Sequence, residues 1–169
     1  QVDMVTEHVR ELFKATSLWV YSIQSGKLAS AELLERFAVK DGQKVLLAVM
    51  RSNDERLAAR FTGVAHYDGS PLFADQYQWL SWLVEFAKHH PEYVVIFRVH
   101  PREFPNKREG VTSQNANAFL KFIDGLELPA NFHINLPRDN ISLHDLLKIS
   151  DVLLNNTSTA GLEACLYGI

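Results

Sequence analysis

The sequence predicts an α/β fold in which helices cover both faces of a parallel β-sheet. Four short apolar segments alternate with amphipathic segments of helical periodicity. The first two apolar segments, 44–50 and 94–99, are hydrophobic on both faces, as central strands of a parallel sheet are. The connections are short, which favours right-handed crossovers between neighbouring parallel strands.

Each strand is predicted where an apolar run is bounded by turn residues, and each helix where apolar residues recur every three or four positions. The predicted strands are 44–50, 94–99, 132–136 and 152–155. The predicted helices are 2–23, 31–39, 52–61, 76–90, 113–125, 143–149 and a last one that begins near Ser158. Residues 18–21 fit a short strand equally well. We expect loops at 68–71 and 105–110, the second of them mobile.

The composition is that of one globular domain. A chain of 169 residues with 47% hydrophobic residues buries roughly 70% of its unfolded surface, enough for a core without disulfides or metal. Cys165 is the single cysteine, which favours a reducing compartment. The net charge of −3 gives no general attraction to nucleic acid, and no apolar run approaches the roughly 20 residues that span a bilayer. We expect a cytoplasmic location, including the inner face of the membrane by peripheral association.

The two ends of the chain predict that it is part of a longer protein. It begins at Gln1 rather than methionine, and it stops at Ile169, directly after the glycine that ends the last helix and where a further strand is expected. We expect residues 1–43 to form a helical or inter-domain connection. Residues 44–169 would then be a ligand-binding domain without its last strands.

Arg98 and His100 follow the second predicted strand and indicate an anion-binding site. Side chains alternate across a strand, so these two point to the same side, where an open α/β sheet holds its ligand. A guanidinium and an imidazole both donate hydrogen bonds to phosphate. The alternative is that Arg98 pairs with a nearby acid such as Glu103.

A run of hydroxyl residues after the fourth predicted strand indicates a second part of the same site. Thr157, Ser158 and Thr159 precede the last helix, where unpaired N–H groups and the helix dipole attract phosphate. One hydroxyl is needed as a helix cap, and three exceed that need. Gly161 allows close approach to the backbone, either by a ligand or by a packed strand.

Glu163 lies one turn into this helix and is not explained by a capping box. Such a box needs the acid three residues after the capping Ser or Thr, and none of the three hydroxyl residues has that spacing to Glu163. Its carboxylate could accept hydrogen bonds from two ribose hydroxyls, or it could be an ordinary surface residue. Ser52 and Glu55 do have capping-box spacing. The weaker site candidates are Arg51, Ser52, Asn53, Asn156 and Gly161.

The sequence gives no sign of a metal ion or a cofactor. The remaining histidines have no partner at metal-ligand spacing, and Cys clusters and HExxH are absent. The glycine patterns of standard dinucleotide and P-loop sites are absent as well. We therefore expect no metal site and no bound cofactor.

Several motifs together resemble those of one enzyme family. Residues 98–103 read Arg-Val-His-Pro-Arg-Glu, residues 141–143 Ile-Ser-Leu, residues 150–154 Ser-Asp-Val-Leu-Leu, and residues 158–164 Ser-Thr-Ala-Gly-Leu-Glu-Ala before Tyr167-Gly168-Ile169. In this order they resemble the carboxy-terminal, donor-binding half of a GT-B-fold glycosyltransferase. The resemblance covers about residues 44–169 and is nearest to bacterial capsule polysaccharide biosynthesis proteins of the Kdo-transferase type.

The resemblance implies a Rossmann-like domain that binds a nucleotide-activated sugar for capsule or surface polysaccharide synthesis. It implies that His100, Ser158 and Thr159 hold the donor phosphate, that Arg98 assists, and that Glu163 binds ribose. Enzymes with these features often use donors such as CMP-Kdo or CMP-sialic acid. A polysaccharide or lipid-linked acceptor, and commonly the catalytic base, would be held by an amino-terminal domain, so this chain alone is expected to bind donor without transferring sugar. The alternatives are a GT-B-like nucleotide-sugar epimerase and a non-catalytic sugar-nucleotide-binding domain.

Overall fold

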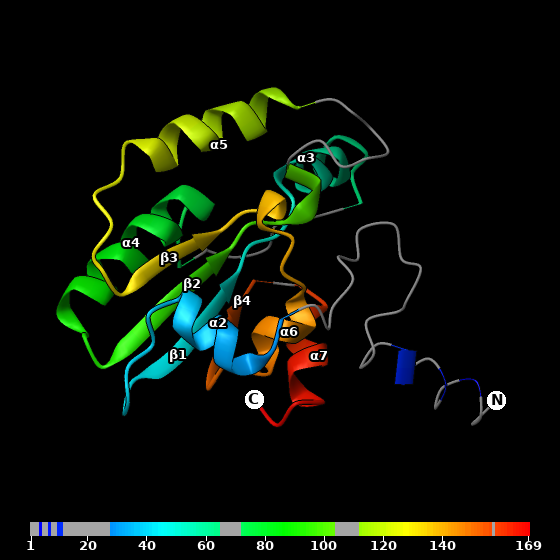
Figure 1. Cartoon of the computed structure of the whole chain (residues 1–169). Helices are drawn as coiled ribbons and strands as arrows, with labels where there is room; N and C mark the ends of the chain where they lie inside the picture. The colour runs from blue at the N-terminus through cyan, green and yellow to red at the C-terminus, as the bar shows by residue number, and fades with distance from the viewer. Residues whose placement is uncertain are drawn as a thin grey trace.

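The described part of the chain contains one four-stranded parallel sheet. The computed structural model describes residues 4, 7, 10–11, 28–64, 72–103, 112–156 and 158–169. The strands are β1 (Lys44–Val49), β2 (Tyr93–Arg98), β3 (Phe132–Asn135) and β4 (Val152–Asn155). Their spatial order is β3-β2-β1-β4, and all three neighbouring pairs are parallel (Figure 1). The predicted α/β, Rossmann-like class is confirmed.

Six described helices surround the sheet, and three of them begin at a residue whose side chain caps the first turn. The six are α2 (Ser30–Arg36), α3 (Asn53–Phe61), α4 (Gln76–His89), α5 (Gln114–Asp124), α6 (Leu143–Leu147) and α7 (Ala160–Cys165). As predicted, Asp75 caps α4 and accepts a hydrogen bond from the N–H of Gln78 at 2.8 Å. Ser113 caps α5 and Ser142 caps α6 in the same way. Among the described helices, none has both the length and the apolar character needed to cross a membrane.

Some predicted boundaries shift in the structure. Helix α2 ends at Arg36 instead of residue 39, because Ala38 has a left-handed backbone conformation with φ of 50°. Helix α7 begins at Ala160, two residues later than predicted. Of the predicted helix 2–23, the four described residues, 4, 7, 10 and 11, are helical. The rest of that segment, the predicted loops 68–71 and 105–110, and the Glu55 side chain lie outside the described residues.

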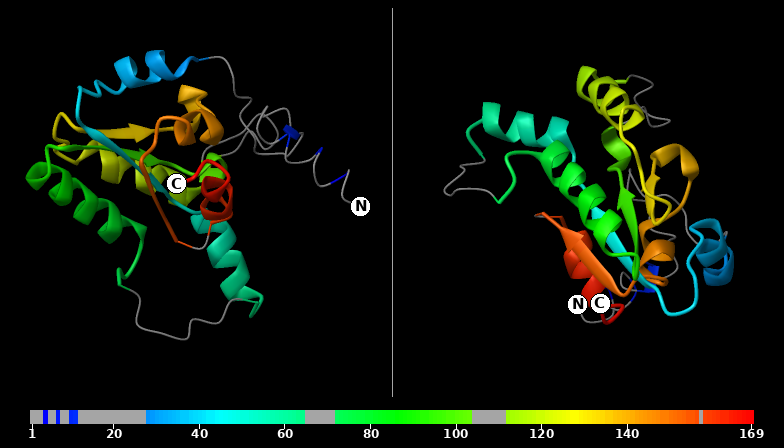
Figure 2. Two further views of the ribbon diagram at one scale, coloured as in Figure 1. Left: turned by 90° about the horizontal axis from the view of Figure 1, so that it is seen from below. Right: turned by 90° about the vertical axis from the view of Figure 1, so that its left-hand side faces the viewer.

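Two apolar clusters, one on each face of the sheet, form the core. Figure 2 shows the helices that lie over the two faces. On one face, α4 and α5 pack over residues such as Val95 and Phe97. On the other face, α2, α6 and α7 pack over residues such as Leu47 and Ile96. Leu33 and Phe37 of α2 belong to this second cluster, so the helix that precedes residue 44 shares its core with the sheet.

The topology indicates the carboxyl edge of the sheet as the edge where a ligand would bind. The chain moves outward from β1 through β2 to β3, and it then returns past them to place β4 on the other side of β1. The direction of winding therefore reverses between β1 and β4, and ligands of open α/β sheets bind beyond such a reversal. The strand ends Val49, Arg98, Asn135 and Asn155 lie in register at this edge.

Phe97 is expected to be a major source of stability. Its ring is fully buried, 5.6 Å from that of Trp79 and 6.4 Å from that of Phe119 between centroids. Phe97→Ala should lower the free energy of unfolding by about 3–5 kcal/mol, measured by urea denaturation. Phe61→Ala is the matched control, because Phe61 is 91% exposed, and it should change that free energy by less than about 0.5 kcal/mol. Similar losses in the two variants would contradict this packing.

Asp151 should make the free energy of unfolding depend on pH in the acidic range. Its carboxylate accepts hydrogen bonds from Lys44 Nζ and from the N–H of Val45, both at 2.8 Å. These contacts, the one with Lys44 foremost, hold the pKa of Asp151 below its usual value of 3.8. On acidification the unfolded chain is protonated first, so this stabilisation is present above about pH 4 and is lost as the pH falls through the folded-state pKa. Urea denaturation from pH 5 to pH 2 measures the free energy of unfolding of the wild type and of Asp151→Asn. The difference between the two proteins should shrink as the pH falls, and a constant difference would contradict the ion pair.

Candidate functional site

Four side chains that are far apart in the sequence meet beside the carboxyl end of β2, on the face covered by α6 and α7. We call Arg98, His144, Glu163 and Tyr167 the polar cluster. His144 Nδ1 lies 3.0 Å from the Tyr167 hydroxyl, and His144 Nε2 lies 3.5 Å from Glu163 Oε2. The charge of Arg98 acts on both Glu163 and His144. The structure thus brings Arg98 and Glu163, two of the predicted site residues, into one electrostatic environment.

Arg98 is buried more deeply than the sequence analysis expected. Only 6% of the residue is exposed, and its Nη1 donates to Asn135 Oδ1 and to the carbonyl of Ile141, both at 2.8 Å. Burial lowers the pKa of Arg98 to about 10, which leaves it charged at neutral pH. The alternative pairing of Arg98 with Glu103 is not seen among the described residues; the guanidinium is directed to Asn135 and Ile141, and Glu103 accepts a hydrogen bond from the N–H of Asn53. Arg98 therefore acts on Glu163 and His144 through its charge, while its Nη1 is hydrogen-bonded to Asn135 and Ile141.

Glu163 is a half-buried carboxylate with opposing influences on its charge. Its side chain is 24% exposed, and burial raises its pKa. A hydrogen bond with the side chain of Thr159 and the charge of Arg98 act in the opposite direction. Since a desolvated carboxylate is costly unless it is hydrogen-bonded, this position is unlike that of an ordinary surface glutamate.

His144 and Tyr167 were missed as site residues by the sequence analysis. His144 was set aside there because it has no partner at metal-ligand spacing. Its partners are Glu163 and Tyr167, which lie about twenty residues further along the chain. A usable signal was present, since His144 follows the capping residue Ser142 in the connection after the third strand, at the ligand-binding edge.

The start of α7 presents hydroxyl groups, while its backbone donors are already used. Ser158 Oγ accepts from the N–H of Ala160, whereas Thr159, the N-cap residue, makes no side-chain hydrogen bond to the backbone of the first turn. The N–H groups of residues 161–163 donate to the carbonyls of Ser158 and Thr159. An anion at this point would therefore meet the hydroxyls of Ser158 and Thr159 rather than free N–H groups. Thr157 lies outside the described residues.

Gly161 is explained by packing against the neighbouring strand. A Cβ atom at this position would overlap Nδ2 of Asn155, at the end of β4. This contact supports the packing explanation that the sequence left open, and the approach of a ligand to Gly161 stays a prediction. The atom that approaches Gly161 is the end of an exposed side chain of β4.

The loop after β1 is held by buried hydrogen bonds. Gln76 of α4 accepts from the N–H of Arg51 and donates to the Arg51 carbonyl and to Asn53 Oδ1. Ser52 is only 1% exposed. These hydrogen bonds fix the segment that holds three of the weaker candidates, Arg51, Ser52 and Asn53, at this edge of the sheet. His100 lies just beyond β2 at the same edge and is partly exposed.

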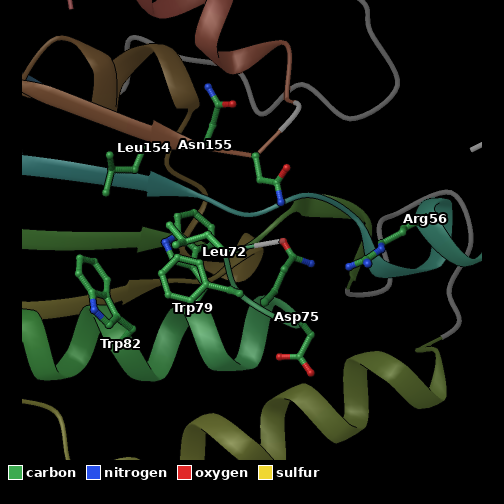
Figure 3. A pocket seen from close by; sticks show the side chains of 10 residues that line it. Arg56, Leu72, Asp75, Trp79, Trp82, Leu154 and Asn155 are labelled. Atoms are coloured by element: carbon green, nitrogen blue, oxygen red, sulfur yellow. The ribbon is translucent and has the colours of Figure 1, made fainter. Parts of the chain in front are cut away.

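A cavity of about 620 Å³ lies on the opposite face of the sheet, between α4 and the end of β4 (Figure 3). Trp79, Trp82 and Leu154 form its apolar part, and Arg56 lies at the other end. Asn155 and Asn156, at the end of β4, complete its lining, with the Asn155 amide directed away from the tryptophans and toward α7. The predicted candidate Asn156 therefore faces this cavity, while Glu163 and His144 lie on the α7 side of β4.

Among the residues that the structure describes, no three His, Cys, Asp or Glu side chains converge as metal ligands. Comparison with protein-family models, curated proteins and solved structures finds no match to this chain.

The contact between Gly161 and Asn155 predicts coupling between a pair of variants. Alanine has a helix propensity about 1 kcal/mol better than glycine, but in the wild-type background Gly161→Ala must displace the Asn155 side chain. Because the displaced atom is the end of an exposed side chain, the substitution should gain less than this in the wild type and the full amount in an Asn155→Ala background. Urea denaturation of the four proteins in the cycle measures the coupling. Equal effects in both backgrounds would contradict the close contact.

Proposed function

We propose that this chain binds a nucleotide-activated sugar and serves as the donor-binding domain of a glycosyltransferase for bacterial capsule or surface polysaccharide. The observation that carries the proposal is the half-buried carboxylate of Glu163, held beside Thr159 and above Arg98 at the carboxyl edge of the sheet. A carboxylate in such a position is suited to accept hydrogen bonds from two adjacent hydroxyls. Ribose provides such a pair.

The phosphate of the donor would lie next to this carboxylate, at the start of α7. The hydroxyls of Ser158 and of the preceding Thr157 are the proposed contacts, together with His100 from the end of β2. Thr159 donates its single hydroxyl proton to Glu163 and so acts on the carboxylate rather than on the phosphate. Arg98 would contribute positive potential from beneath, because its Nη1 is occupied by Asn135 and Ile141. Location at the point where the sheet topology reverses supports this placement.

The proposed contribution to sugar transfer is electrostatic. When the sugar leaves, negative charge increases on the phosphate of the departing nucleotide. Fixed donors directed at that phosphate stabilise the transition state more than the ground state, which lowers the barrier. His100, the α7 hydroxyls and the buried charge of Arg98 would supply this stabilisation.

Nucleotide binding to the chain tests the proposal. CMP, CDP, UDP, GDP and ADP are compared by thermal shift, and the best of them by calorimetry. A nucleotide at 100 times its dissociation constant should stabilise the fold by about 2.7 kcal/mol. Absence of any shift across the whole panel would refute the assignment.

His100→Ala should weaken nucleotide binding by about 10- to 100-fold, since a hydrogen bond to a charged phosphate is lost. His89→Ala is the matched control, because this exposed histidine ends α4, and the chain enters β2 a few residues later at the opposite edge of the sheet. Dissociation constants from calorimetry distinguish the two. If His100→Ala binds as tightly as the control, His100 is not part of the phosphate site.

A further inference from the structure

His144 has a neighbouring polar side chain at each of its ring nitrogens, Tyr167 at one and Glu163 at the other. Nδ1 lies 3.0 Å from the hydroxyl of Tyr167, and Nε2 lies 3.5 Å from Glu163 Oε2. The imidazole is well covered, with 12% of its side chain exposed. Its ring lies 6.0 Å from that of Tyr167 between centroids. The histidine thus stands between the tyrosine and the carboxylate.

The chemistry of these groups determines the direction of the two contacts. Burial and the nearby charges of Lys148 and Arg98 lower the pKa of His144, against the opposite effect of Asp145, and so favour the neutral imidazole. A neutral imidazole has one N–H and one acceptor nitrogen. Because an ionised carboxylate can only accept, the N–H belongs on Nε2, facing Glu163. Nδ1 then accepts from Tyr167, whose pKa is raised by burial, so its hydroxyl remains protonated.

Glu163 is therefore contacted from two sides. His144 faces Oε2, and the side chain of Thr159 forms a hydrogen bond with the same carboxylate. A carboxylate held in this way loses rotational freedom before a ligand arrives. The ordering cost of binding is then smaller, and the direction of the remaining lone pairs is set in advance.

We propose that His144, oriented by Tyr167, is a positioning residue that holds Glu163 for two adjacent hydroxyls of a ligand and thereby makes the site selective for ribonucleotides over 2′-deoxyribonucleotides. This inference rests on the proposed nucleotide-binding function. It adds two residues to the site and a property, sugar selectivity, that the phosphate contacts do not determine. A ligand without one hydroxyl leaves the fixed carboxylate with an unmatched acceptor, which is the basis of strong rejection.

A purely structural role for His144 leads to a different result. If the histidine only joined α6 to the turn after α7, its removal would lower the stability of the fold. It would then also reduce the affinities for ribonucleotides and deoxyribonucleotides by the same factor. The ratio of the two dissociation constants separates positioning from structure, because effects on folding and on the phosphate contacts cancel in it.

The test is calorimetry of the chain with CMP and 2′-deoxy-CMP. The wild type should prefer CMP by about 10- to 100-fold, as expected for hydrogen bonds to a charged group. His144→Ala should reduce this preference to less than about threefold, whereas His144→Gln, whose amide N–H can still reach Glu163, should retain most of it. Tyr167→Phe keeps the ring but removes the hydroxyl that orients the imidazole, and it should give an intermediate ratio.

Two comparisons make the outcome decisive. In a Glu163→Gln background, His144→Ala should have no further effect on the ratio, because the group that it positions has lost its charge. An unchanged ratio in His144→Ala overturns the inference and leaves the proposed function standing; if that variant does not fold, an unchanged ratio in Tyr167→Phe does the same. Absence of CMP binding to the wild type, together with absence of a shift across the nucleotide panel, overturns the proposed function and this inference with it.

Discussion

The buried guanidinium of Arg98 is the interaction on which the fold and the candidate site both depend. A charge removed from water costs several kcal/mol unless it is hydrogen-bonded and compensated. Arg98 meets this requirement through Asn135 at the end of β3 and through the carbonyl of Ile141, just before α6. It thereby ties together the end of β2, the end of β3 and the segment that leads to His144. The negative charge of Glu163 adds compensation from α7.

This arrangement makes the site part of the core rather than an addition to it. Helices α6 and α7 are only five and six residues long, too short to be stable by themselves. They are held by apolar contacts such as those of Leu146 and Ala164 with the second core cluster. His144 belongs to α6 and Glu163 to α7, so both are positioned by these apolar contacts. A change in the packing of either helix would therefore move His144 and Glu163 relative to each other.

Strand β4 separates two environments at the carboxyl edge. On one side its Asn155 packs against Gly161 and sets the position of α7. On the other side, its last residues line the cavity with Trp79 and Trp82. Gly161, in the first turn of α7, has no Cβ and so leaves room for the Asn155 side chain beside the helix backbone.

The sequence was informative wherever the signal is local. The predicted strands were found within one or two residues, because apolar runs on both faces report a buried parallel strand directly. The Asp75 cap was identified for the same reason, since donor and acceptor are three residues apart. Helix α2 was predicted too long because the left-handed conformation of Ala38 has no clear signature in the residue itself. The roles of His144 and Tyr167 were missed because their partners come from other elements.

The amino-acid sequence by itself determined the class of fold, the order of its elements and the edge of the sheet at which polar residues collect. Hydrophobic periodicity and strand-to-helix order are sufficient for these, because they follow from backbone geometry and the burial of apolar surface. Only the tertiary structure decided which of the polar residues meet. Arg98 turned inward to Asn135 and Ile141, Gly161 received a strand side chain, and His144 came to lie between Tyr167 and Glu163. Such pairings depend on the register of four strands and on the packing of two short helices, and no local pattern specifies them.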